Sequence, residues 1–200
     1  ATGIIEEIMD HAKGLQRDFP AMGVRAGMTT NAYLLTRPVF ERMLGRAVVD
    51  YQIAFDGPRE FHDRKRVLSG GKGTFDRIWE NVVAMREVEG EFDVIVRLHV
   101  DRENKAAIPE FVDLYREVFG ADRRFQIFIR SLSRLGGAND HALQVLEESE
   151  REATIAKYRA YAARTGARVG PEADVGTPSG ICYAARGNSF VVRANGRLNK

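Results

Sequence analysis

A loop of polar residues and glycines follows the most apolar strand-like stretch of the chain. It begins at Asp56 and holds His62, Arg64 and Arg66, and it ends in the run GGKGT from Gly70 to Thr74. Two arginines can hold a carboxylate through paired N–H donors, and a glycine-rich turn before a helix can bind an anion, such as a phosphate, with its amides. A solvated loop closed by an N-capping threonine explains the same residues. Both interpretations stay open at this point.

Side chains suited to other chemistry are few. The histidines have no metal-ligand spacing, so we interpret them as structural or surface residues: His11, His62, His99 and His141. The sequence contains no GxSxG, HExxH, CxxC or Walker-type motif. The single cysteine, Cys182, rules out an internal disulfide, and it is either a buried thiol or a soft metal ligand.

The hydrophobic pattern predicts strands that alternate with helices. Because each strand is followed by a helix, the strands are expected to be parallel with right-handed crossovers. The predicted fold class is α/β, a partial (βα) TIM-like barrel with about four parallel strands where a closed barrel needs about eight. Ligands of such folds bind at the loops after the carboxyl ends of the strands. The predicted helices span 4–19, 36–44, 74–89, 108–119 and 146–164, and the predicted strands span 24–30, 49–55, 92–100 and 124–132.

The chain is expected to contain three regions. Residues 1–166 form the partial barrel, residues 167–180 form a linker, and residues 181–200 begin a small β-hairpin region that turns at Asn195 and Gly196. A helix precedes the first predicted strand, which would then be a bare apolar edge. We therefore expect an interior segment of a longer protein that lacks at least two βα units at its start.

The composition favours a cytoplasmic protein. Hydrophobic residues make up 44% of the chain and charged residues 29%, with a formal net charge of +2. The basic residues are spread along the chain, which argues against a nucleic-acid partner. No apolar run approaches the roughly 20 residues of a membrane span, and no secretory signal pattern is present. We predict neither a nucleic-acid nor a membrane partner.

Four segments together resemble the radical S-adenosylmethionine (radical SAM) enzymes, and more narrowly those with the cysteine-rich SPASM extension, which modify peptides and proteins. The family ends one barrel strand in TTNG and the next in S-x-DG, followed by HDxxR and GxGTF. The resemblance covers roughly residues 4–164 and resumes at Cys182. The matching segments are TTNAYLLT (29–36), QIAFDGPREFHDRKRV (52–67), GKGTFDRIWEN (71–81) and RFQIFIRSLSRLGG (124–137).

This resemblance implies an oxidoreductase that reductively cleaves S-adenosylmethionine with a 4Fe-4S cluster and abstracts hydrogen from a peptide or protein side chain. It implies a peptide or protein substrate and an electron donor such as flavodoxin or ferredoxin. Sulfatase maturation and peptide cross-linking both stay open. Arg66 would meet the methionyl carboxylate or fix its own loop. The residues that it places at the cofactor are Thr30, Asn31, Asp56, Arg66, Arg97 and Leu132.

The resemblance also gives Cys182 a role as a ligand of an auxiliary iron–sulfur cluster. In the SPASM extension a second cysteine follows the glycine represented here by Gly196, so we expect cysteine as the residue after Lys200. The family's CxxxCxxC and GGEP motifs do not occur in this sequence and are expected upstream, so the segment alone is expected to be inactive. Two residues depart from the pattern: Ala32 stands where the family has glycine, and Ala54 stands where a serine commonly contacts the cofactor ribose.

Two other functions remain as alternatives. One is a different (βα) barrel enzyme, a lyase or isomerase, that binds a substrate phosphate at residues 70–74. The other is a catalytically silent binding fragment.

Overall fold

The computed structural model describes residues 2–170, 187–193 and 195–199. The chain divides into two compact units, residues 1–170 and 171–200. Each unit is described by itself.

The first unit alternates helices and strands, as predicted. In chain order its elements are α1 (Thr2–Asp18), β1 (Ala26–Thr30), α2 (Arg37–Leu44), β2 (Val48–Phe55), α3 (Arg59–Lys65), α4 (Phe75–Met85), β3 (Asp93–Val100), the 3-10 turn η1 (Lys105–Ala107), α5 (Ile108–Phe119), β4 (Phe125–Ser131), the 3-10 turn η2 (Asp140–Ala142) and α6 (Glu148–Arg164). The α-helix that the sequence did not predict is α3, which lies in the segment expected to be an irregular loop.

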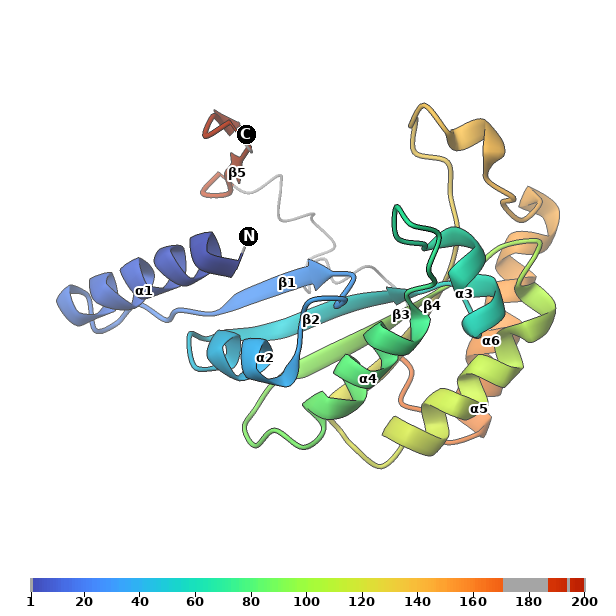
Figure 1. Cartoon of the computed structure of the whole chain (residues 1–200), viewed down its shortest axis with the longest axis horizontal. Coiled ribbons are helices and arrows are strands. Elements are labelled where there is room, and N and C mark those ends of the chain that lie inside the picture. Colours follow the sequence, from blue (N-terminus) through green and yellow to red (C-terminus); the bar gives the residue numbers. More distant parts are fainter. Residues whose placement is uncertain (1, 171–186, 194, 200) are drawn as a thin grey trace. The chain divides into compact units, whose positions relative to one another are not determined.

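The four strands form one parallel sheet in the order β1-β2-β3-β4, which confirms the predicted fold class. Helices α2, α4 and α5 lie along the same side of this sheet (Figure 1). Side chains alternate between the two sides. Tyr51, Ile53 and Phe55 of β2, for example, point into the core beneath the helices.

The opposite side of the sheet is called the inner face here. It carries mainly polar side chains, at positions that the strand register brings into rows across the sheet. Its residues are Thr29 of β1, Gln52 and Ala54 of β2, Ile95, Arg97 and His99 of β3, and Gln126, Phe128 and Arg130 of β4.

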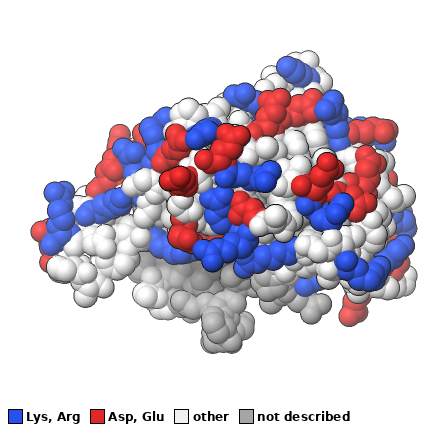
Figure 2. Space-filling model, turned by 90° about the horizontal axis from the view of Figure 1, so that it is seen from below, with Lys and Arg blue, Asp and Glu red and all other residues white. Residues whose placement is uncertain are grey.

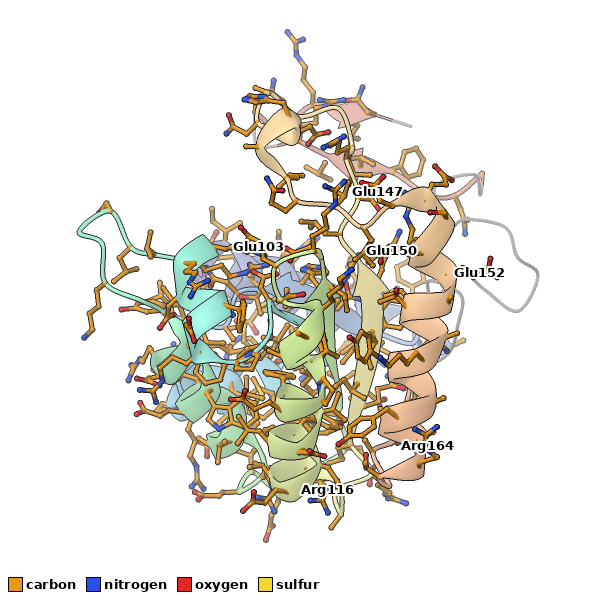
Figure 3. All side chains as sticks on the ribbon, turned by 90° about the vertical axis from the view of Figure 1, so that its right-hand side faces the viewer. Glu103, Arg116, Glu147, Glu150, Glu152 and Arg164 are labelled. Carbon is orange, nitrogen blue, oxygen red and sulfur yellow. The ribbon has the colours of Figure 1, made fainter. Side chains whose placement is uncertain are left out.

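Helices α5 and α6 run antiparallel to the strands, so their amino ends lie at the carboxyl edge of the sheet. Figure 3 shows Glu147, Glu150 and Glu152 at the amino end of α6 and Arg164 at its other end. This distribution suits the helix dipole. Glu150 also binds Lys105 over 2.8 Å, which attaches α6 to the loop after β3.

Helix α1 differs from its prediction in what it buries. Its apolar residues were expected to form an inward face, but only Met9 is buried, while Ile8 and the nearby Phe19 are 61% and 62% exposed. The helix is held largely by polar contacts with the region of α2. Arg42 binds Glu6 over 3.1 Å, and Lys13 Nζ donates to the carbonyl of Gly45 over 2.6 Å.

Residues 167–170 continue the sheet beyond β4. The amide of Ile127 donates to the carbonyl of Arg168, and the amide of Gly170 donates to the carbonyl of Ile127, both over 2.8 Å. These four residues, which the sequence analysis assigned to the linker, therefore lie within the first unit.

The described part of the second unit is an antiparallel hairpin of β5 (Val191–Val192) and β6 (Leu198–Asn199). Gly196 in its turn has a φ of 78°, a conformation that glycine adopts without strain. The predicted hairpin is confirmed. Cys182 and most of the predicted linker lie outside the described residues.

Acidic and basic side chains are interspersed on the face of the molecule shown in Figure 2, as expected for a net charge of +2. None of the helices among the described residues has both the length and the apolar character to span a bilayer.

Candidate functional site

The inner face carries a row of three residues near the carboxyl ends of the strands. Ala54, Arg97 and Phe128 lie opposite one another in the strand register. Arg97 Nη1 donates to Gln52 Oε1 over 3.1 Å. Ala54 contributes only a methyl group to this row, next to a guanidinium and an aromatic ring. This row could therefore hold a ligand with an anionic group.

A second polar group lies at the carboxyl edge, around Asp56. Arg66 Nε donates to Asp56 Oδ2 over 2.5 Å, and His99 Nδ1 lies 3.1 Å from Asp56 Oδ1. Burial alone would raise the pKa of Asp56, but the hydrogen bonds from His99 and Arg66 and the Arg66 charge hold that pKa well below its usual range. Asp56 is therefore a buried carboxylate with both oxygens engaged.

Asn104 joins the ends of β2 and β3 beside this carboxylate. Its Nδ2 donates to the carbonyl oxygens of Asp56 and His99, over 3.0 and 2.8 Å, and its Oδ1 accepts from the amide of Asp101 over 2.9 Å. The side chain is completely buried. Asn104 thus fixes the backbone that carries Asp56 and His99.

Helix α3 presents His62 to the backbone of Asp56 on one side and to Thr74 on the other. The Asp56 amide donates to His62 Nδ1 over 3.4 Å, and His62 Nε2 lies 3.3 Å from Thr74 Oγ1. Because the Thr74 hydroxyl donates to the Arg66 carbonyl over 2.7 Å, it accepts from His62 Nε2–H. Burial lowers the pKa of His62 to about 4. His62 is therefore a neutral structural histidine, as the sequence analysis interpreted it.

The amino end of α4 is capped by Asp63, not by Thr74 as predicted. Asp63 Oδ1 accepts from the amides of Thr74 and Phe75 over 2.7 and 2.8 Å, while Thr74 makes no side-chain cap. A Cβ at Gly73 would overlap the Asp63 carboxylate, which explains the glycine. The amides of Thr74 and Phe75, which a phosphate at this helix end would use, are therefore already bonded to a carboxylate. This cap disfavours a phosphate at residues 70–74.

The end of β1 is folded back by its own side chains. Thr30 Oγ1 accepts from the amide of Ala32, and Asn31 Oδ1 accepts from the amide of Tyr33, both over 3.1 Å. The buried Asn81 of α4 donates to the carbonyls of Ala32 and Tyr33 over 2.8 and 3.0 Å. Ala32 has a φ of 57°, which accounts for the glycine at this position in the resembling family.

One hollow of about 380 Å³ lies at this carboxyl edge, between the loop after β1 and the segment that joins α3 to α4. It brings two of the predicted cofactor residues, Asn31 and Arg66, to the same cavity. The lining residues are Asn31, Tyr33, Leu34, Arg66, Val67, Leu68, Thr74 and Ile78.

The residues expected at the cofactor all lie toward the carboxyl ends of the strands. Thr30 and Asn31 end β1, Asp56 and Arg66 bind each other, and Arg97 lies on the inner face. Leu132 follows β4, and its amide donates to the Val100 carbonyl over 2.8 Å. The roles of His99, Asn81 and Asn104 were not predicted from the sequence. Each of the three contacts a residue more than forty positions away in the chain.

Among the described residues, Arg97 on the inner face has the charge that a ligand carboxylate, such as that of S-adenosylmethionine, requires. Within the described ranges, no group of three or more His, Cys, Asp or Glu side chains could hold a metal ion. Cys182, the predicted cluster ligand, falls outside those ranges.

No protein-family profile and no curated protein matches this sequence. Solved structures match its fold. Native anSMEcpe with bound AdoMet, that is S-adenosylmethionine, aligns with a TM-score of 0.61 and 16% identity, over 82% of this chain and 44% of that chain. AnSMEcpe with bound AdoMet and the Kp18Cys peptide aligns with a TM-score of 0.59 and 17% identity, over 82% of this chain and 45% of that chain.

A third structure, with AdoMet and the Cp18Cys peptide, aligns with a TM-score of 0.61, 17% identity and the same two coverages, 82% and 45%. This chain thus spans less than half the length of these proteins. AnSMEcpe is a radical SAM enzyme, so the fold agrees with the resemblance given by the motifs. The chain has the fold of part of a radical SAM barrel.

Proposed function

We propose that this chain is part of a radical SAM enzyme with a SPASM extension, which uses S-adenosylmethionine to abstract hydrogen from a peptide or protein side chain. The observation that carries the proposal is the shared fold, over 82% of this chain, with structures that hold AdoMet and a peptide. The motif residues support it because they form one connected structure at the carboxyl edge of the sheet.

The residues of this chain would bind and orient the cofactor. Arg97 would pair with its carboxylate, and Thr30, Asn31 and Leu132 would line its site at the ends of β1 and β4. Arg66 would border the site beside Asn31, and Asp56 would hold the Arg66 guanidinium in place through their ion pair. S-adenosylmethionine, when bound, supplies the hydrogen-abstracting chemistry.

The remaining parts of the proposal concern partners. The substrate would be a peptide or protein, as in sulfatase maturation or peptide cross-linking. Cys182 would be a ligand of an auxiliary 4Fe-4S cluster, and a flavodoxin or ferredoxin would supply electrons. The protein would act in the cytoplasm.

The test uses the intact polypeptide that contains this segment. After anaerobic reconstitution with iron and sulfide, it is incubated with S-adenosylmethionine and dithionite, and 5′-deoxyadenosine is measured by mass spectrometry. We expect turnover, and we expect Arg97→Met to weaken S-adenosylmethionine binding at least tenfold, since loss of a charged hydrogen bond costs about 1.5–3 kcal/mol.

The control is Arg123→Met, because the Arg123 side chain is 82% exposed and, among the described residues, forms an ion pair only with the exposed Glu91. This variant should bind S-adenosylmethionine as tightly as the wild type does. If the reconstituted wild type forms no 5′-deoxyadenosine, the proposed function is wrong.

A further inference from the structure

His99 is the last inner-face residue of β3, and a carboxylate orients its ring. Its Nδ1 lies 3.1 Å from Asp56 Oδ1. An ionised carboxylate can only accept hydrogen bonds, so Nδ1 must carry the hydrogen. Asp56 cannot turn away, because Arg66 binds its other oxygen and Asn104 holds its carbonyl. A neutral His99 ring therefore carries its hydrogen on Nδ1.

The other ring nitrogen, Nε2, then presents a lone pair. No hydrogen bond to it is found among the described residues, and the side chain is 18% exposed. The charged side chains around His99 include Asp56, which Nδ1 already contacts, and Arg66, Arg97 and Arg130, whose guanidinium groups only donate hydrogen bonds. His99 Nε2 thus adds an acceptor beside these donors.

His99 also lies closer to the carboxyl edge than Arg97 does, by two residues of the same strand. Ligands enter parallel sheets from this edge. If the anionic group of a bound molecule pairs with Arg97, His99 lies between that group and the edge of the sheet. His99 would then contact either the rest of the same molecule or a second molecule bound at the edge.

We propose that His99 Nε2 accepts a hydrogen bond from a hydroxyl, thiol or amine of the molecule bound on the inner face, with Asp56 as the positioning residue. The inference rests on the proposed function for the identity of that molecule. Both S-adenosylmethionine and a peptide carry such donors, so the experiment distinguishes the two sources.

The intact polypeptide is labelled with ¹⁵N-histidine, and long-range ¹H–¹⁵N correlations report the tautomer of each ring. The signals of His99 are those that disappear in His99→Asn, since the asparagine amide can keep the bond to Asp56 but removes the distal acceptor. We expect a protonated Nδ1 and a bare Nε2. A ring with its hydrogen on Nε2 overturns the proposal.

Ligands are then added in two steps, first S-adenosylmethionine alone and then the Kp18Cys peptide. Movement of the Nε2 resonance in the first step assigns the donor to the cofactor, and movement only in the second assigns it to the peptide. Calorimetry should show about tenfold weaker binding of that same ligand to His99→Asn. His11→Asn, which changes an exposed histidine of α1, should bind like the wild type.

The two hypotheses fail differently. If S-adenosylmethionine binds to the wild type but neither probe moves the Nε2 resonance, or if His99→Asn binds both as tightly as the wild type, the role of His99 is wrong and the proposed function stands. If the wild type binds neither molecule and forms no 5′-deoxyadenosine, the proposed function is wrong and the inference falls with it.

Discussion

Arg66 binds Asp56 so closely, with Nε 2.5 Å from Oδ2, that each side chain has its charge balanced within the protein. Only 8% of the Asp56 side chain is exposed, against 32% for Arg66. The two roles open to Arg66 from the sequence were to meet the cofactor carboxylate or to fix its loop. The ion pair favours the second role, because a buried carboxylate already occupies the guanidinium.

Arg66→Ala should therefore reduce stability more than cofactor binding. Removing the arginine leaves the Asp56 charge buried without its main partner, which costs about 3 kcal/mol, while S-adenosylmethionine affinity should stay within about twofold. Urea unfolding and calorimetry measure the two effects. Arg64→Ala is the matched control, because Arg64 lies two residues before Arg66, in an exposed pair with Glu60 of α3, worth about 0.5 kcal/mol. A tenfold loss of affinity at unchanged stability would instead place Arg66 at the cofactor.

Gly73→Ala should disrupt the cap of α4. The new Cβ would overlap the Asp63 carboxylate, which must move and release the amides of Thr74 and Phe75. Loss of such a cap costs about 1–2 kcal/mol in the free energy of unfolding. Gly70→Ala is the control in the same loop, since a Cβ there meets nothing within 4 Å. Equal stability of the two variants would contradict this account of the glycine.

Ala32→Gly should stabilise the protein. Ala32 is buried and has a φ of 57°, a left-handed conformation that costs an L-residue about 1–2 kcal/mol. Glycine removes this strain, but it also gives the unfolded chain more conformational entropy, which lowers the stability by about 0.4–1 kcal/mol. The net gain in the free energy of unfolding should therefore be about 0.5–1 kcal/mol. The same exchange in the interior of α6, Ala156→Gly, should destabilise by about 1 kcal/mol. A loss of stability at position 32 would show that the strain is relieved elsewhere.

Elements with a strong local signal were predicted well. Helix α5 begins at Ile108 and ends at Phe119 as predicted, because Pro109 favours a first turn and four aromatic or aliphatic residues recur at helical spacing. The strands, with their apolar alternation, were placed to within two residues. Helix α3 was missed because its sequence, REFHDRK, has no apolar periodicity. His62 and Asp63 hold it through contacts outside the helix.

The residues of the candidate site also divide into those with a local sequence signal and those without one. Asp56 and Arg66 belong to motifs that the sequence displays, and the structure adds that they bind each other. His99, Asn81 and Asn104 carry no local signal, because each acts on groups supplied by strands or loops far away in the chain. An isolated asparagine that binds two backbone carbonyls looks the same in a sequence as one on the surface.

The stability of the protein should fall between pH 7 and pH 4.5 because of His62. Its pKa is about 4 in the folded protein, against about 6.5 in the unfolded chain, so the unfolded chain binds more protons between these values. The stabilisation is complete above pH 6.5 and is lost as the pH falls toward 4. It amounts to about 2 kcal/mol over the interval from pH 7 to pH 4.5. Urea unfolding at both pH values measures it.

His62→Gln isolates this contribution. Glutamine keeps a polar side chain but does not titrate, so the variant should be less stable at pH 7 and should lose about 2 kcal/mol less than the wild type on acidification. Asp56 adds little in this interval, because its unfolded pKa is about 3.9 and its folded pKa lies lower. His141→Gln, an exposed change, should keep the wild-type pH dependence. If His62→Gln and the wild type lose stability in parallel, the hydrogen bonds assigned to a neutral His62 are wrong.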